Sequence, residues 1–331
     1  MTDEFLRECI GPPREQYDVT AVQETLADPV WDLLDRGGKR WRAVLALVCF
    51  EAFRADPHAH LDYACIPELV HNGSLLVDDV EDEAALRRGG PAIHREYGRD
   101  VALNAGNALY FLPFHLLERT ATDLPSATQC ELYRRLTTEI LSLHLGQGMD
   151  IHWHSSTHPE VSPATYLEMT VRKTGSLARL STEIPAIVTN QPPAVRETLR
   201  AYATDIAIAF QISDDVLDVE TAAEHGGDFG KEFGNDIKEG KVTLLTIAAL
   251  AEAGPADARF LREVLADDDP NRDDIDDAIA VLRETGSVEY ARDQAITFSD
   301  RACSHLEEID LPAESRAELE SFAAFAVERV V

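Results

Sequence analysis

The sequence predicts an all-α protein, a single-domain bundle of about ten or more helices around a central cavity. Apolar residues recur at three- and four-residue spacing through most of the 331 residues, whereas two-residue alternation is hard to find. Hydrophobic residues make up 45% of the chain, enough for a substantial core. No stretch has the length and Ser/Gly content of an interdomain tether, so we expect residues 1–331 to form one domain.

Local signals indicate where several helices begin and end. Asp28 before Pro29 and Ser162 before Pro163 each predict a helix start, because the first residue can cap free N–H groups and proline loses no hydrogen bond there. The pair of glycines at 37–38 predicts the end of the first of these helices. Loops are expected at residues 155–163, 189–193, 221–241 and 267–274.

The chain is strongly acidic. It carries 60 Asp and Glu against 30 Lys and Arg, a net charge of -30 spread along most of its length. Such a surface repels nucleic acid and anionic lipid, so neither is an expected partner. The apolar runs near 43–50 and 206–212 are too short to span a bilayer, and no secretory signal pattern opens the chain. We expect a cytoplasmic protein without stable membrane insertion.

Lysine accounts for only five of the 30 basic residues. Together with the acidity, this predicts a halophilic protein from a salt-rich cytoplasm, where a Debye length of about 3 Å at 1 M salt screens self-repulsion. We expect the midpoint of thermal unfolding to rise between low and multimolar KCl. A midpoint that stays level or falls over this range would count against the hypothesis.

The five cysteines are scattered and lack CxxC spacing. An odd number without this spacing predicts neither a disulfide framework nor a zinc site. We expect reduced thiols packed in the core.

A first aspartate cluster lies in the run HNGSLLVDDVED, at residues 71–82. On a helix, Asp78 and Asp82 are one turn apart on one face, with side chains about 5–6 Å from each other. His71 lies two turns before Asp78 on the same stripe. Oxygen ligands on one face suit a hard cation.

A second cluster, QISDDVLD, places Gln211, Asp214, Asp215 and Asp218 on one helical stripe in an apolar run. Burying these carboxylates without a counter-charge is costly, so a cation is implied. We expect Mg²⁺, which binds one or two carboxylates together with phosphates and waters. The alternative is that each DDxxD is only a solvated acidic face, but two matches in apolar helices favour metal binding.

With these motifs the sequence resembles the trans-isoprenyl diphosphate synthase (polyprenyl synthetase) family, and in particular its geranylgeranyl diphosphate synthases. LLVDDVEDEAALRRGGPAIH resembles the first aspartate-rich motif, QISDDVLD the second and GGKRWR the amino-terminal phosphate-binding motif. RKTG at 172–175 and EGKVTL at 239–244 match further family motifs. All five occur in the family's order between about residues 37 and 245, whereas residues 246–331, expected to be C-terminal helices, carry none.

The resemblance implies a Mg²⁺-dependent enzyme that condenses isopentenyl diphosphate with dimethylallyl, geranyl or farnesyl diphosphate. It implies a magnesium site on the allylic diphosphate formed by Asp78, Asp79, Asp82, Asp214, Asp215 and Asp218, with Asp78, Asp82, Asp214 and Asp218 as the principal ligands. It implies contacts to the allylic diphosphate from Arg87, Lys173, Thr174, Gln211, Lys231 and Lys241. It implies an isopentenyl diphosphate site made by Lys39, Arg42, His71 and Arg88, with Gly38 allowing the backbone to approach a phosphate. The dipoles around Lys173, Thr174 and Gln211 would also stabilise the carbocation.

The positions of the lysines agree with this assignment. Four of the five fall on motif positions, and Lys238 is the exception. If lysine is depleted from the surface, the remaining ones are expected where a compact ammonium group meets phosphate.

Product length is expected to depend on what blocks the growing chain along the first aspartate helix. One helical turn of about 5.4 Å matches roughly one isoprene unit. Gly73 and Ser74 are too small to block the chain. The resemblance implies a floor made by Tyr110, Phe111 and His144 and mainly a C20 product, with C15 and C25 as alternatives. A different reading is that Tyr110 and Phe111 are plain core aromatics.

Two other classes of protein share some of these features. A terpene cyclase or head-to-head condensing synthase does not need GGKRWR for a second diphosphate, so this motif favours chain elongation. A non-catalytic synthase subunit could lose one aspartate cluster, yet both are intact. The family also implies a homodimer.

Overall fold

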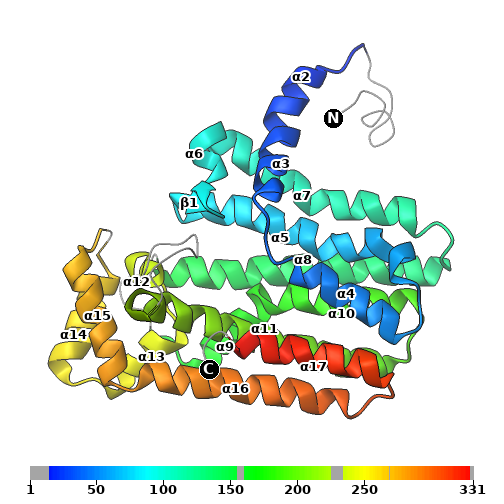
Figure 1. Cartoon of the computed structure of the whole chain (residues 1–331). Helices are drawn as coiled ribbons and strands as arrows, with labels where there is room; N and C mark the ends of the chain where they lie inside the picture. The colour runs from blue at the N-terminus through cyan, green and yellow to red at the C-terminus, as the bar shows by residue number, and fades with distance from the viewer. Residues whose placement is uncertain (1–14, 155–159, 225–233, 268, 329–331) are drawn as a thin grey trace. The chain divides into compact units, whose positions relative to one another are not determined.

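The computed structural model describes residues 15–154, 160–224, 234–267 and 269–328, which are almost wholly helical (Figure 1). The all-α prediction is confirmed. Contacts divide the chain into two compact units, so the predictions of a single domain and of a central cavity stay predictions. Among the described residues, no helix has both the length and the apolar character needed to cross a membrane.

The first unit contains residues up to 43 and residues 62–133. Its elements are α2 (Val19–Val22), the π-helical turn Gln23–Ala27, α3 (Asp28–Asp35), α5 (Leu61–Glu81), β1 (Leu86–Arg87), β2 (Gly90–Pro91), α6 (Ile93–Tyr97) and α7 (Arg99–Thr120). A core cluster of Leu33, Leu76, Ile93, Ala102, Ala105 and Leu109 joins α3, α5, α6 and α7.

Two glycines allow α5 and α7 to cross closely. A Cβ atom on Gly73 would lie 2.9 Å from the carbonyl oxygen of Gly106 and 2.9 Å from Cβ of Leu109. A Cβ atom on Gly106 would lie 2.8 Å from Cγ2 of Val77. The small size of Gly73 therefore serves the close packing of α5 against α7.

α3 begins at the predicted Asp28, with Pro29 in its first turn. Asp28 does not cap a free helix end, however, because the chain is already helical from Val19 and Asp28 accepts a hydrogen bond from the side chain of Gln23. The break at residues 37–38 is confirmed, because α3 ends at Asp35 and α4 (Trp41–Ala52) begins beyond the two glycines.

A short β-hairpin follows the first aspartate helix and was not expected from the sequence. β1 and β2 pair antiparallel, and both turn residues, Arg88 (φ 52°) and Gly89 (φ 73°), have positive φ, as in a type I′ turn. Arg36 at the end of α3 donates to the carbonyl oxygens of Pro91 at 2.5 Å and Arg87 at 3.3 Å. Because Arg36 also binds Asp32, the hairpin is fixed to α3.

The second unit contains residues 44–61 and most residues beyond 133. Its elements are the 3₁₀ helix Pro57–His60, α9 (Pro163–Lys173), α10 (Gly175–Val188), α11 (Pro193–Glu224), α12 (Asn235–Lys238), α13 (Leu244–Glu252), α14 (Pro255–Leu265), α15 (Arg272–Glu284), α16 (Ser287–Leu306) and α17 (Ala313–Val327). α4, α8 (Ser126–His154) and, through Leu61, α5 have residues in both units.

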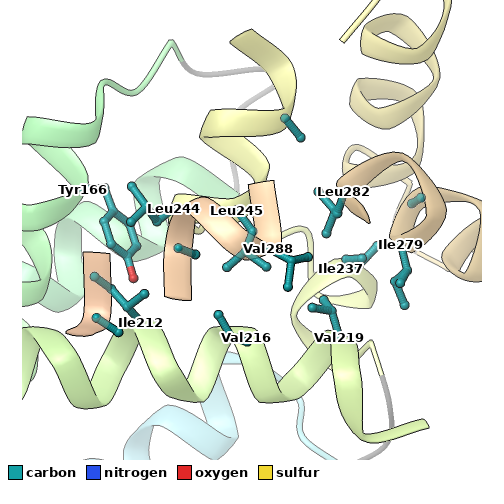
Figure 2. Packing of buried hydrophobic residues seen from close by; sticks show 14 of the residues in the cluster. Tyr166, Ile212, Val216, Val219, Ile237, Leu244, Leu245, Ile279, Leu282 and Val288 are labelled. Carbon is teal, nitrogen blue, oxygen red and sulfur yellow. The ribbon is translucent and has the colours of Figure 1, made fainter. Parts of the chain in front are cut away.

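The long helix α11 packs against α10, α16 and α17. One face of it carries Ile212, Val216 and Val219 into a buried cluster (Figure 2). Leu244, Leu245 and other apolar side chains complete this cluster. The second aspartate motif therefore lies on a helix that the core holds firmly.

Most of the other predicted boundaries are close to those observed. The start at Ser162 is confirmed, because its hydroxyl accepts from the N–H of Thr165 at 3.1 Å. Helices end and begin around 189–193 and 267–274, as predicted. The loop predicted at 221–241 is wrong in part, because α11 continues to Glu224 and α12 lies within the range. Residues 155–159 and 225–233 lie outside the described residues.

The core prediction for the cysteines holds for one of them. Cys49 is buried, but Cys65 and Cys130 are exposed and Cys303 is half-buried. Cys9 lies outside the described residues. All four described cysteines are free thiols, as predicted.

Candidate active site

The first aspartate motif occupies the last turns of α5. Asp78 and Asp82 are half-buried, whereas Asp79 is 1% exposed. Nε of Arg87 donates to Oδ1 of Asp79 at 2.7 Å, and Nη2 donates to the same oxygen. Burial raises the pKa of Asp79, and Arg87 opposes that rise. Asp79 thus forms a buried ion pair through Oδ1, while its buried Oδ2 has no hydrogen-bond partner in the described residues. Its expected place beside the metal stays a prediction.

Arg87 is fixed by the same contact. Its Nη2 lies 3.9 Å from Oδ2 of Asp78, so the guanidinium adjoins two carboxylates. Burial lowers the pKa of Arg87, but Asp79 and Asp78 outweigh this effect and raise it overall. The predicted contact of Arg87 with the allylic diphosphate stays a prediction.

A second group of predicted residues forms a cationic cluster, defined here as Arg40, Arg42, His71 and Arg88. Loss of hydration lowers the pKa of His71 well below its usual range, and Arg42, Arg88, Arg87 and Arg40 lower it further. A neutral imidazole therefore lies among several guanidinium groups, an arrangement suited to a multiply charged anion. Three residues predicted to bind isopentenyl diphosphate are brought together here.

Gly38 and Lys39, the other residues predicted at the isopentenyl diphosphate site, lie in the break between α3 and α4. A Cβ atom on Gly38 would lie 3.0 Å from Nη2 of Arg88, so the space at Gly38 is occupied by that guanidinium. Nη1 of Arg88 donates to the carbonyl oxygen of Leu33 at 3.0 Å. Lys39 lies exposed on the same turn. Arg40 was not predicted, although it stands inside GGKRWR.

The second aspartate motif, on α11, repeats the pattern of the first. Asp214 and Asp218 are half-buried, while Asp215 is buried. Asp215 accepts from the hydroxyl of Tyr166 at 2.6 Å and from Nε2 of Gln211 at 2.9 Å. Burial raises the pKa of Asp215 well above its usual range, and neighbouring Asp236 adds to the rise. This carboxyl therefore holds Tyr166 and Gln211. The expectation that Asp215 takes part in metal binding stays a prediction.

The break between α9 and α10 brings together three predicted residues. The hydroxyl of Thr174 donates to Oε1 of Gln211 at 2.8 Å. Nζ of Lys173 donates to Oδ2 of Asp150 at 2.6 Å. Asp150 was not predicted, although it follows His144, a residue expected in the chain-length floor, by six positions on α8.

The two remaining predicted lysines differ in what the structure describes. Lys241 is half-buried and its ammonium group contacts the carboxylate of Glu239. Lys231 lies outside the described residues. The predicted contacts of both with the allylic diphosphate stay predictions.

The predicted chain-length floor is not one uniform surface. Tyr110 on α7 is 7% exposed, and burial raises its pKa, with Glu81 and Asp78 adding to the rise. Tyr110 therefore lies close enough to the first motif for the carboxylates of Asp78 and Glu81 to raise its pKa. Phe111 is 71% exposed, which does not favour a place in a closed wall within one chain. His144, on α8, is also exposed.

The accessible carboxylates fit a divalent ion that arrives with a phosphate. In the residues that the structure describes, no group of three or more His, Cys, Asp or Glu side chains is arranged to hold a metal by itself. Each motif instead offers two accessible aspartates, Asp78 with Asp82 and Asp214 with Asp218. Mg²⁺ usually takes one or two carboxylates and completes its shell with substrate phosphates and water.

Known proteins are similar to this chain over most of its length. The chain is 33% identical over 315 residues to geranylfarnesyl diphosphate synthase of Natronomonas pharaonis, covering 90% of this chain and 88% of the relative. It is 34% identical over 296 residues to geranylgeranyl pyrophosphate synthase of Geoglobus acetivorans, covering 89% and 88%.

Solved structures show the same fold. Polyprenyl synthase from Caulobacter crescentus, complexed with calcium and isoprenyl diphosphate, superimposes with a TM-score of 0.83 at 28% identity, covering 96% of this chain and 92% of that one. Geranylgeranyl pyrophosphate synthase from Corynebacterium glutamicum, complexed with isoprenyl diphosphate and magnesium, gives 0.79 at 27% identity, covering 94% and 95%. The polyprenyl synthetase family model matches residues 23–282. The chain therefore belongs to the polyprenyl synthetase family.

Proposed function

We propose that the protein condenses isopentenyl diphosphate with allylic diphosphates to give mainly geranylgeranyl diphosphate, with release of diphosphate. The observation that carries this proposal is the helix α5. It contributes His71 to the cationic cluster and, two turns later, Asp78. Asp82, the other accessible aspartate, follows directly after the helix and its N–H donates to the carbonyl oxygen of Asp78 at 2.8 Å. This helix thus contributes to two proposed sites, one for the diphosphate of isopentenyl diphosphate and one for the metal-bound allylic diphosphate. A reaction between two diphosphate substrates requires both.

The residues divide the chemical work between them. Arg42 and Arg88 would bind the diphosphate of isopentenyl diphosphate, while neutral His71 donates a hydrogen bond. Lys173, Thr174 and Gln211 would stabilise the allylic diphosphate as its C–O bond breaks and positive charge develops on carbon. The double bond of isopentenyl diphosphate then attacks that carbon, and the departing diphosphate takes the final proton.

Magnesium is the proposed ion, held by Asp78, Asp82, Asp214 and Asp218. When bound, it neutralises the charge that builds up on the leaving diphosphate. This proposal is supported by the accessible carboxylate pairs and by the magnesium and isoprenyl diphosphate present in the Corynebacterium structure.

A C25 product is the second candidate, because the Natronomonas relative is a geranylfarnesyl diphosphate synthase. The test is incubation of the protein with labelled isopentenyl diphosphate and each of the three primers, in Mg²⁺ and high salt. We expect C20 as the main product from every primer. A main C25 product would replace the proposed chain length, and no elongation under any condition would refute the function.

We also propose a homodimer. Its support is the family resemblance together with large apolar side chains exposed on α7, Phe111 at 71% and Leu103 at 36%. Light scattering at working concentrations should give twice the chain mass. A monomeric mass would contradict the proposal.

Tyr110 is the described residue that best fits a chain-length determinant. Replacing it with alanine should shift the main product from C20 to longer chains, because a buried side chain near Asp78 is removed. Product analysis by chromatography measures the shift, and Phe111→Ala is the comparison. If Phe111→Ala lengthens the product and Tyr110→Ala does not, the floor is formed differently from what burial indicates.

A further inference from the structure

We propose that Arg179 and Glu139 form a positioning pair that fixes the break between α9 and α10, and so places Lys173 and Thr174 for the allylic diphosphate. The inference rests on the proposed function for its catalytic meaning. Its structural part concerns the second unit alone and can be tested separately.

The pair is buried and its geometry is well defined. Arg179 is 3% exposed and Glu139 is fully buried. Nε and Nη2 of Arg179 donate to Oε2 of Glu139 at 3.0 Å and 2.5 Å. The carboxylate therefore fixes the orientation of the guanidinium plane.

The remaining nitrogen of this guanidinium reaches the main chain beside the break. Nη1 of Arg179 donates to the carbonyl oxygen of Val171 at 2.9 Å. Val171 lies in the last turn of α9, two residues before Lys173, where a cation is favoured by the exposed carbonyl groups. The hydroxyl of Ser176 donates to the carbonyl oxygen of Lys173 at 3.0 Å, so side chains of α10 hold the end of α9 at two points.

Glycines beside the break between α9 and α10 leave room for the contact between Arg179 and the main chain. A Cβ atom on Gly175 would lie 2.9 Å from Nη1 of Arg179. On α8, Glu139, Gly146 and Asp150 follow one another at spacings of seven and four residues and so share a helix face. From that face Glu139 holds Arg179, Gly146 gives Lys173 room, and Asp150 accepts from Lys173.

A general stabilising role is the alternative, and the rest of the ion network allows the two to be separated. Nη1 of Arg200 lies 3.1 Å from Oε1 of Glu139 and 3.2 Å from Glu183. Arg200 thus binds the same glutamate as Arg179, but Arg179 also binds the main chain of α9. A buried ion pair often adds little net stability relative to apolar residues, so this additional contact is the feature that calls for explanation.

The experiment compares Arg179→Met with Arg200→Gln in the full-length protein. kcat, the KM for each substrate, the unfolding midpoint and hydrogen exchange of residues 170–176 are measured for both. Arg179→Met should raise the KM for the allylic substrate or lower kcat by about 10- to 100-fold, because a small misplacement of positioning groups is costly. The KM for isopentenyl diphosphate should stay near the wild-type value, and exchange in 170–176 should accelerate.

Arg200→Gln should lower the unfolding midpoint while leaving the kinetic constants and this exchange close to wild type. Arg179→Lys, which keeps a charge opposite Glu139, should recover part of the activity and serves as the test if Arg179→Met does not fold. Equal effects of the Arg179 and Arg200 variants on all four measurements, or unchanged exchange in Arg179→Met, would overturn the proposal. A wild-type protein without elongation activity would refute the proposed function instead, and the exchange comparison would still decide the positioning role.

Discussion

Asp78→Asn is expected to lower kcat by about 10²- to 10³-fold, the size of effect that follows loss of one preorganised electrostatic group. The unfolding midpoint should stay close to wild type. Asp78 is half-buried, and Arg87 keeps its two hydrogen bonds to Asp79 when Asp78 loses its charge. Steady-state turnover with labelled isopentenyl diphosphate and thermal melting by circular dichroism measure the two quantities.

The neighbouring Asp79→Asn is the matched control, because it removes the same charge one residue away. Asp79 is buried and holds Arg87, so its loss leaves a guanidinium without its buried counter-ion. The free energy of unfolding should fall by about 3–5 kcal/mol. If Asp79→Asn were fully stable and Asp78→Asn fully active, the assignment of one aspartate to metal and the other to structure would be wrong.

The sequence predicted which residues belong to the site better than it predicted the environment of each one. Helical periodicity correctly placed Asp78 with Asp82, and Asp214 with Asp218, on accessible stripes. Periodicity alone could not show that the middle aspartate of each motif turns inward, because that depends on a partner outside its helix. Arg87 follows Asp79 by eight residues, beyond the end of α5, and Tyr166 precedes Asp215 by 49 residues.

Two features of the fold were missed for a similar physical reason. The size of Gly73 was considered only for the path of the growing chain, whereas it serves the close approach of α7. Asp28 was expected to cap the start of a helix, yet the residues before it are already helical. In both cases packing or continuity of the chain outweighed a local preference.

Gly146 and Gly148 offer the sharpest test of how α8 positions the break between α9 and α10. A Cβ atom on Gly146 would lie 2.4 Å from the backbone nitrogen of Lys173 and 2.9 Å from its Cα atom, whereas one on Gly148 meets nothing within 4 Å. Because the clash at Gly146 is with main chain, α9 or α10 must move to relieve it.

Gly146→Ala should therefore cost about 1–3 kcal/mol of unfolding free energy through overpacking and lower kcat by about 10- to 100-fold through displacement of Lys173 and Thr174. Gly148→Ala should leave turnover unchanged and gain about 0.5–1 kcal/mol, since alanine is the better helix former. Chemical denaturation and steady-state kinetics on both variants measure these effects. Both alanines have the same intrinsic preference for the helix, so any difference between the variants arises from what each Cβ atom meets. Two variants with the same activity and stability would show that α8 and the break adjust to each other freely, and the α8 face would then have no positioning role.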